Sequence, residues 1–456
     1  MRSPENEQSA GPGRRIPGRS FVTWSLGYGM ARRFFASAAK KGDLIARLET
    51  DRALQLDPYE AYRELRARGP VAPGRVAWGT SSHEAVTTVL RSDAFGSGGG
   101  HSELPGPLAK IFGTTVDPWA ASVVDPPSML ATDGAAHTRY RRLVSRAFTA
   151  KAISGLEESI RGVADRLLDD LEASKATDFD LVERYAALLP VAVIADMLGV
   201  PDSMHTTLLD WGDGAARTLD PTLSWRDFRA AEGDMRHLHR WLAQHIRDLR
   251  ANPGDDLLSR LAVAQEDEQL TDFELRATGL LVLGAGFETT VSLISNAVQL
   301  MAEHPEQHEI VLAEPDLLGG AVDEVLRFDS PVQVTMRIAP AETEVLGTLV
   351  PARTPVLCYL GGANRDPEVF TDPDRFDVTR ENAGSHLAFS SGAHFCLGAS
   401  LARREAEVGL RALYERFPDL AVSAPPVRRP TRVLRGWENL HVTTQAPARA
   451  RQVHAT

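Results

Sequence analysis

The 456-residue sequence has only two cysteines, Cys358 and Cys396. Two thiols exclude the disulfide framework of a small secreted protein, so we expect a cytoplasmic location. They are also too few for an iron–sulfur cluster, which normally takes four cysteine ligands. An excess of positive charge is missing as well, because the formal net charge is −11. We therefore expect no general affinity for nucleic acid.

Long apolar runs are scarce near the N-terminus. The stretch from Phe21 to Met30 is apolar, but Arg32 and Arg33 follow it closely. It is too short to span a bilayer and lacks the clean apolar run of a signal peptide. Residues 1–50 carry nine Lys/Arg against four Asp/Glu. We predict a basic N-terminal extension over 1–50 that packs on the domain surface, with the first ~20 residues lacking fixed structure. The alternative is an amphipathic helix that touches a membrane or a partner.

Repeats and Gly/Ser-rich linkers are also absent, so we expect one large domain over 51–446 and a short tail over 447–456. Helical periodicity dominates, for example over 57–68 and through much of 150–250. Short strand-like runs are expected at 71–78, 354–360 and 434–443. The sequence predicts a mainly α protein with small β-sheets.

The most informative predicted helix spans 271–303. Thr271 and Glu274 form a capping-box pattern ahead of an apolar run, and Pro305 marks the far end. Polar residues within the run make it too interrupted for a transmembrane helix. This stretch is therefore predicted to be a long core helix.

The middle of this helix contains Gly284, Gly286, Glu288 and Thr289. Each glycine costs about 1 kcal/mol relative to alanine, and a buried carboxylate needs a partner or a function. Close helix packing and a salt bridge for Glu288 would explain the pattern as well as a ligand site would. A hydroxyl beside a carboxylate could instead carry protons to a bound group. The string GAGFET lacks the third glycine of a dinucleotide fingerprint, so no flavin or NAD(P) site is expected.

The second informative stretch surrounds Cys396, which lies just ahead of a predicted helix. Backbone N–H groups and the helix dipole at that position favour a thiolate. Gly392 and Gly398 would allow close approach of the backbone to a flat ligand and unusual dihedral angles, and Phe389 could shield the sulfur. Cys358, in an apolar strand, reads as a small buried hydrophobe. A nucleophilic cysteine enzyme is an alternative, but no histidine stands out as its base.

Four motifs, in order along the chain, resemble those of the cytochrome P450 superfamily from about Asp57 to the C-terminus. The central helix matches [AG]-G-x-[DE]-T-T at 285–290, and the cysteine loop matches F-G-x-G-x-H-x-C-x-G with Ser390 at a glycine position. E-x-x-R appears at 324–327 and P-x-R-F at 373–376. The resemblance implies a single P450-fold domain with haem b between the central helix and the helix that follows the cysteine loop.

The resemblance also implies site residues. Cys396 would be the axial ligand of the haem iron, and Glu288 and Thr289 would manage protons when dioxygen is activated. The remaining residues expected to bind the cofactor are His394, Arg337, His137, Arg141, Phe389, Gly392, Gly398, Ala285 and Gly286. Glu324 and Arg327 share a helix face at i, i+3, and Arg375 would complete a buried, structural ion network with them.

The implied activity is a haem-thiolate monooxygenase that hydroxylates or epoxidises a small hydrophobic substrate, such as a secondary metabolite of polyketide or terpenoid type. The expected pocket segments, 95–119, 281–285 and 332–334, are mostly apolar. Electrons would come from a separate ferredoxin and its reductase, which would dock on a basic patch of Arg139, Arg142, Arg403 and Arg404. The protein is expected to be a monomer. The alternatives are a haem-thiolate enzyme of coupling, dehydrating or rearranging type, a non-catalytic haem-binding protein, and a cysteine hydrolase.

Overall fold

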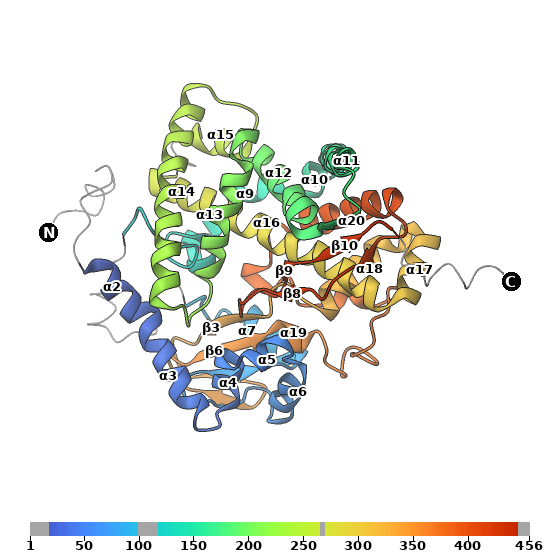
Figure 1. The fold of residues 1–456 in the computed structure, drawn as a ribbon. Coiled ribbons are helices and arrows are strands. Elements are labelled where there is room, and N and C mark those ends of the chain that lie inside the picture. The colour runs from blue at the N-terminus through green and yellow to red at the C-terminus, as the bar shows by residue number, and fades with distance from the viewer. Residues whose placement is uncertain (1–17, 99–116, 265–269, 446–456) are drawn as a thin grey trace.

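The structure is a computed structural model that describes residues 18–98, 117–264 and 270–445. The expectations for the first residues and for the tail 447–456 lie outside these ranges, as does most of the expected pocket segment 95–119. The described chain is mainly helical with small sheets, which confirms the predicted fold class (Figure 1).

The α-helices up to the centre of the chain are α2 (Arg19–Trp24), α3 (Met30–Ala39), α4 (Leu44–Thr50), α5 (Arg52–Leu56), α6 (Tyr59–Ala67), α7 (His83–Arg91), α9 (Gly134–Ser145), α10 (Ala150–Ser154), α11 (Glu157–Ser174), α12 (Leu188–Met197), α13 (His205–Arg217), α14 (Trp225–Ala251) and α15 (Leu257–Ala262). Those that follow are α16 (Asp272–Glu303), α17 (Pro305–Ala313), α18 (Leu318–Phe328), α19 (Leu360–Ala363) and α20 (Ala399–Arg416). The π-helical turns are η1 (Ser25–Gly29) and η4 (Val182–Ala186), and the 3-10 turns are η2 (Met129–Ala131), η3 (Arg146–Phe148), η5 (Asp202–Met204), η7 (Pro315–Leu317), η8 (Ala383–Ser385) and η9 (Gly392–His394).

The strands are β1 (Trp78–Thr80), β2 (Asp178–Asp180), β3 (Val334–Ile338), β4 (Thr343–Val345), β5 (Thr348–Val350), β6 (Pro355–Tyr359), β7 (Ala421–Val422), β8 (Val427–Arg428), β9 (Trp437–Asn439) and β10 (His441–Thr443). One sheet has the order β1-β6-β3, with β1 parallel and β3 antiparallel to β6. A second sheet, β2-β10-β7, is antiparallel, and β4-β5 and β8-β9 are two-stranded. The first sheet lies with α3 to α6 on one side of the helical body (Figure 1).

The predicted strand at 71–78 is wrong, because the structure has only β1 at Trp78–Thr80 and an isolated bridge between Ala72 and Gly79. Pro73 and Gly74 interrupt the stretch, and proline cannot donate a ladder hydrogen bond. The other two expected strand regions contain β6, β9 and β10.

Helix α16 crosses the middle of the molecule (Figure 1). The Thr271 side chain accepts a hydrogen bond from the Glu274 N–H, and the Glu274 carboxylate accepts one from the Thr271 N–H at 2.8 Å, which confirms the capping box. Within the described ranges α16 is the one helix long and apolar enough to cross a membrane, and 78% of its apolar window is buried inside the protein. It is therefore the central helix of the core.

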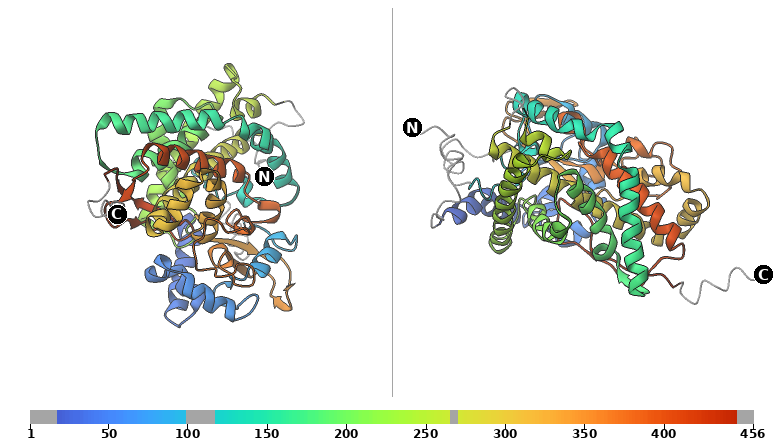
Figure 2. Two further views of the ribbon diagram at one scale, coloured as in Figure 1. Left: turned by 90° about the vertical axis from the view of Figure 1, so that its right-hand side faces the viewer. Right: turned by 90° about the horizontal axis from the view of Figure 1, so that it is seen from above.

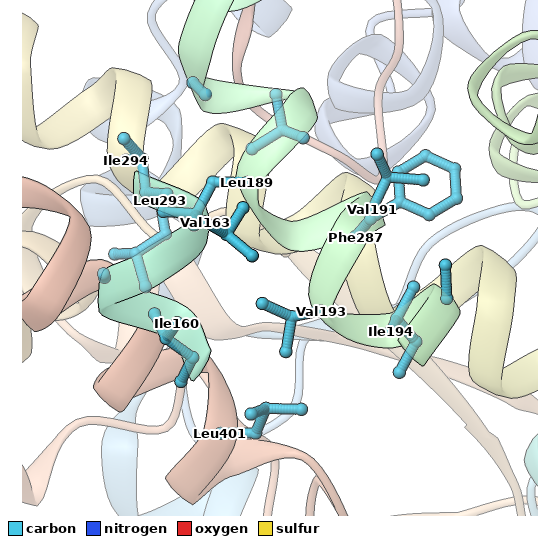
Figure 3. Close-up of a cluster of buried hydrophobic side chains, with 14 of the residues drawn as sticks. Ile160, Val163, Leu189, Val191, Val193, Ile194, Phe287, Leu293, Ile294 and Leu401 are labelled. Atoms are coloured by element: carbon cyan, nitrogen blue, oxygen red, sulfur yellow. The ribbon is translucent and has the colours of Figure 1, made fainter. Parts of the chain in front are cut away.

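The largest apolar core forms around α16. Figure 3 shows Ile160 and Val163 from α11, Val193 and Ile194 from α12, and Leu293 from α16 pointing into one buried cluster. Helix α20 joins the same core and lies beside α11 (Figure 2). The segment after the cysteine loop is thus anchored in the most buried part of the protein.

The N-terminal helices pack on the loop between α13 and α14. The Trp24 indole N–H donates to the Leu223 carbonyl at 3.0 Å, and the buried Tyr28 hydroxyl donates to the Thr218 carbonyl at 3.3 Å. The rings of Tyr28 and Phe228 are 5.5 Å apart. These contacts hold α2 and η1 against the rest of the domain.

Candidate active site

The chain around Cys396 forms a tight loop that ends at the start of α20. The Cys396 N–H donates to the Phe389 carbonyl at 2.9 Å, and the Phe395 N–H donates to the Gly392 carbonyl at 3.0 Å. Cys396 as a whole residue is partly exposed. Burial of its sulfur raises the pKa of the thiol, and a hydrogen bond from the Gly398 backbone lowers it. The helix terminus alone therefore does not make the thiolate, whereas a bound metal ion deprotonates a coordinating thiol outright.

The two loop glycines behave differently. Gly392 has φ +70°, and a Cβ there would lie 2.3 Å from the Leu90 carbonyl oxygen, so the position requires glycine. Gly398 is the N-cap residue of α20 with φ −86°, and a Cβ there would make an ordinary contact with the Phe148 ring at 4.0 Å. The expectation of an unusual dihedral angle is correct for Gly392 and wrong for Gly398. Ser390, at the usual glycine position, has φ +62°.

A cluster of basic side chains lies beside this loop. The rings of His137 and His394 are 4.3 Å apart, although the two residues come from α9 and η9. The His394 ring bonds Asp133 at 2.9 Å, while the His137 Nε2 is buried without a hydrogen-bond partner among the described residues. Burial, followed by the charges of His394 and Arg141, lowers the pKa of His137 to about 4.

The guanidinium of Arg337 adds to the same cluster from β3. It is 6% exposed and donates to the Met336 carbonyl at 2.8 Å and to the Thr335 hydroxyl at 3.2 Å. No ion pair is recorded for it within the described chain. A buried guanidinium next to an unpartnered imidazole nitrogen is a donor set suited to a carboxylate. Haem propionates fit this cluster.

Helix α16 has one open face. Every residue from Leu275 to Met301 is buried except Ala285, Gly286 and Thr289. Ala285 and Thr289 are at i, i+4, and the Thr289 hydroxyl donates to the Ala285 carbonyl at 3.0 Å. The structure therefore brings three of the predicted residues to one exposed patch of an otherwise buried helix.

Gly286, at the edge of this patch, and the adjacent Gly284 and Glu288 serve packing and charge pairing. A Cβ on Gly286 would lie 3.0 Å from Ile194, and one on Gly284 would lie 3.4 Å from the Ala215 Cβ, so both glycines allow close helix contacts. Glu288 is buried and ion-paired with Arg429, which follows β8. Burial raises the pKa of Glu288 and the Arg429 charge opposes that rise. Sequence reasoning missed Arg429 because it lies far along the chain.

The family model "Cytochrome P450" matches residues 109–440 of this chain. The putative cytochrome P450 140 of Mycobacterium tuberculosis is 42% identical over 94% of this chain and 98% of its own length. The 6-deoxyerythronolide B hydroxylase of Saccharopolyspora erythraea is 36% identical over 87% of this chain and 98% of its own. The crystal structure of Mycobacterium smegmatis CYP164A2 with econazole bound superimposes with a TM-score of 0.78 at 34% identity, covering 88% of this chain and 99% of that one.

The chain belongs to the cytochrome P450 family. It is a cytochrome P450 monooxygenase, and members of this family bind haem b with iron and use dioxygen. The predicted family, fold, enzyme class and cofactor are thereby confirmed. The roles of the individual site residues stay predictions.

The E-x-x-R motif of this P450 forms a buried ion pair. Arg327 donates to Glu324 at 2.6 and 2.8 Å, and both side chains are fully buried. The predicted third partner, Arg375, is wrong, because its side chain is 65% exposed and lies 3.6 Å from Asp377. Arg380 takes that place, with its Nε 3.2 Å from Glu324.

The reason for this exchange is the path of the chain after the P-x-R-F motif. The Asp377 N–H donates to Glu324 at 2.9 Å, which turns the segment so that Arg380 points back to the pair. Arg375 contributes only its carbonyl oxygen, which accepts from Arg327 at 3.1 Å. The signal in the sequence was a second arginine five residues after the arginine of the motif.

The arginines of the expected basic patch are largely neutralised in the P450 structure. Arg403 bonds Asp323 at 2.6 Å, and its guanidinium lies 4.6 Å from the Phe389 ring centre. Arg404 lies 3.5 Å from Glu157, and Arg139 pairs with Glu274. The patch therefore presents less net positive charge than the sequence suggested.

Proposed function

We propose that this P450 hydroxylates or epoxidises a small hydrophobic secondary metabolite, with Cys396 as the residue that would hold the haem iron. The observation that carries the proposal is the exposed patch of Ala285, Gly286 and Thr289 on an otherwise buried helix that packs against α20, the helix beginning just after Cys396. When bound, haem supplies oxygen activation, and a thiolate ligand favours O–O cleavage. Cys396 would hold the iron, and His137, Arg141, Arg337 and His394 would hold the propionates.

The substrate class rests on pocket chemistry and on relatives. Leu281 and Val334 are buried and apolar on two of the expected pocket segments, and apolar linings suit apolar ligands. One relative is named for hydroxylating 6-deoxyerythronolide B, and the solved neighbour holds econazole. A polyketide or terpenoid is therefore the substrate type to test first.

The proposed role of Thr289 is to move a proton at its Oγ1. In the structure that hydroxyl donates to the Ala285 carbonyl, on the exposed patch. Replacing Thr289→Ala removes the hydroxyl and leaves the haem-binding residues intact. We expect substrate binding to persist while reducing equivalents are diverted to hydrogen peroxide. The measurement is product and peroxide formed per reductant consumed, and unchanged product yield contradicts the role.

Electrons are proposed to arrive from a ferredoxin and its reductase at the face that holds the cysteine loop. Arg142 lies on α9, which also supplies the buried His137. Because Arg139, Arg403 and Arg404 are paired with carboxylates, docking should depend on salt less steeply than four unpaired arginines would require. Coupled turnover with a ferredoxin, measured at rising ionic strength, tests this docking face. We further propose that the protein is cytoplasmic and monomeric.

The experiment for the function as a whole has two stages. The first is the spectrum of the reduced, carbon monoxide-bound protein, which reports thiolate ligation, with Cys396→Ser as the control that should lose it. The second is a metabolite screen for spin-state shifts, followed by turnover of each hit with a surrogate ferredoxin. Colourless protein after expression with ample haem would refute the proposal.

A further inference from the structure

Glu288 on α16 and Asp213 on α13 share one arginine. The Arg429 Nη1 is ion-paired with the Glu288 carboxylate and lies 3.5 Å from the Asp213 Oδ1. Asp213 also pairs with Arg217, one turn along α13, at 2.6 Å. A single nitrogen of Arg429 therefore serves two carboxylates from two helices.

Arg429 is itself tied to the β8-β9 hairpin. Its backbone N–H donates to the Gly436 carbonyl at 3.2 Å, and its Nε donates to the Trp437 carbonyl at 3.3 Å. The Arg429 side chain is 19% exposed, whereas that of Glu288 is 4% exposed. The hairpin therefore holds the Arg429 guanidinium in place, and the Glu288 carboxylate pairs with it there.

Glu288 consequently leaves α16 away from the open patch. Successive residues of an α-helix are rotated by about 100°, so Glu288 and Thr289 project in different directions. Thr289 belongs to the exposed patch, and Glu288 is buried against Arg429. The side chains of Glu288 and Thr289, which both belong to the described residues, form no hydrogen bond with each other.

We propose that Arg429 is a positioning residue that holds Glu288 out of the haem pocket, and that Asp213 competes for Arg429 and so sets how readily Glu288 turns toward Thr289 to donate a proton. The inference rests on the proposed function, because it concerns the proton route of that same site. It assigns a part in the reaction to two residues outside the family motifs.

The electrostatics of the cluster support this arrangement. Burial raises the pKa of Glu288, the Arg429 charge lowers it, and the Asp213 charge raises it. Arg217 on α13 also lowers the pKa of Glu288 from a greater distance along the same network. Removing Arg429 should therefore raise the pKa of Glu288 further, and removing the Asp213 charge should lower it.

The test compares Arg429→Gln, Arg429→Lys and Asp213→Asn, with Asp210→Asn as a matched control. Asp210 is an exposed carboxylate on the same helix, three residues before Asp213. The first readout is the infrared band of a protonated carboxyl in the resting protein at neutral pH. Because burial also raises the pKa of Glu405, the native protein should already show a carboxyl band, and each variant is compared with it. We expect an added band in Arg429→Gln, its loss when Glu288→Gln is introduced as well, and no added band in Arg429→Lys or Asp210→Asn.

The second readout is the pH profile of product formation. A proton donor must be protonated, so product formation falls once the pH exceeds its pKa. The pKa of the donor therefore sets the position of this high-pH fall, the alkaline limb of the profile. Arg429→Gln should move that limb to higher pH, and Asp213→Asn should move it to lower pH. Product formed per reductant consumed by Arg429→Gln at neutral pH should rise, because Glu288 is then protonated and released toward Thr289, and Arg429→Lys should return it to the native level.

Opposite displacements of the limb support the arrangement, because a variant that merely loosened the fold would not produce them. Alkaline limbs that coincide with that of the native protein, or a carboxyl spectrum of Arg429→Gln identical to that of the native protein, would overturn it. The infrared readout needs no turnover, so a native protein that forms no product defeats the proposed function without deciding the role of Arg429.

Discussion

Two buried glutamates in this P450, Glu324 on α18 and Glu288 on α16, each pair with an arginine, and their surroundings differ. Glu324 accepts two bonds from Arg327, one from the Asp377 N–H and one from Arg380. Glu288 has one arginine, and that arginine is shared with a second carboxylate. A carboxylate whose lone pairs are all satisfied holds a structure in place, whereas one with a shared partner retains a choice of positions.

The distinction between the two glutamates matches their places in the fold. The Glu324 network binds α18 to the segment that precedes the cysteine loop, through backbone oxygens of Asn364 and Pro373 that accept from Arg327 at 3.0 and 2.8 Å. The Glu288 pair lies between the central helix, α13 and a short hairpin. The first site supports the cysteine loop, and the second borders the open patch of α16.

The sharpest way to break the comparison is Arg327→Ala. Glu324 would lose its main partner while fully buried, and stranding a buried charge costs about 3–5 kcal/mol. We expect a loss of that size in the free energy of unfolding and poor retention of haem, measured by denaturant titration and by the absorbance of the purified protein. Stability within about 1 kcal/mol of the native protein would show that the network is not structural.

A second test uses the corrected third partner. Arg380→Ala removes a nearly buried guanidinium that donates hydrogen bonds to Glu324 and to backbone carbonyl oxygens. We therefore expect the free energy of unfolding to fall by about 2 kcal/mol. Arg375→Ala is the matched control five residues earlier, and its exposed side chain should contribute less than about 0.5 kcal/mol. Equal losses in the two variants would restore Arg375 to the network.

Glu405 is a third buried glutamate to compare with Glu324 and Glu288, and within the described residues it has no arginine partner. It lies on α20, its Oε2 has no hydrogen-bond partner there, and burial raises its pKa well above the usual range. The folded state therefore keeps a proton that the unfolded state releases, so stability falls as pH rises above the usual glutamate pKa. That fall is up to about 1.4 kcal/mol per pH unit.

Glu405→Gln should remove this dependence, because glutamine resembles the protonated acid. Denaturant titrations from mildly acidic to alkaline pH should show a variant that gains on the native protein as pH increases. A constant difference across that range would mean that Glu405 is ionised in the folded protein.

The smallest expected effect concerns Ser390 in the cysteine loop, where the backbone conformation and the side-chain hydrogen bonding are both unfavourable. Its φ of +62° suits glycine, and its Oγ is buried without a partner. Ser390→Gly relieves the dihedral strain but adds freedom to the unfolded chain, so we expect a net gain of about 0.5 kcal/mol. Ser390→Ala keeps the Cβ and should show no such gain in thermal denaturation. A less stable glycine variant would mean that the serine side chain supports the loop.

Much of this P450 could be predicted from local patterns. The capping box at Thr271, the long α16 and the helix after Cys396 depend on residues within a few positions of one another, and the structure contains all three. The strand expected at 71–78 was wrong because proline and glycine outweighed its apolar character. Only the family resemblance predicted that His137 and His394 serve the same site, because they are far apart along the chain. In the structure their rings lie 4.3 Å from each other.

The sequence by itself determined the family, the position of the loop around Cys396 and the helix that borders it, because short-range motifs encode them. Only the tertiary structure decided that Arg380 replaces Arg375 at Glu324 and that Arg429 and Asp213 meet at Glu288. Charged side chains find their partners where burial makes an unpaired charge too costly, and burial is a property of the packed chain. The sequence shows which charged side chains are present, and the packing of the folded chain decides which of them form ion pairs.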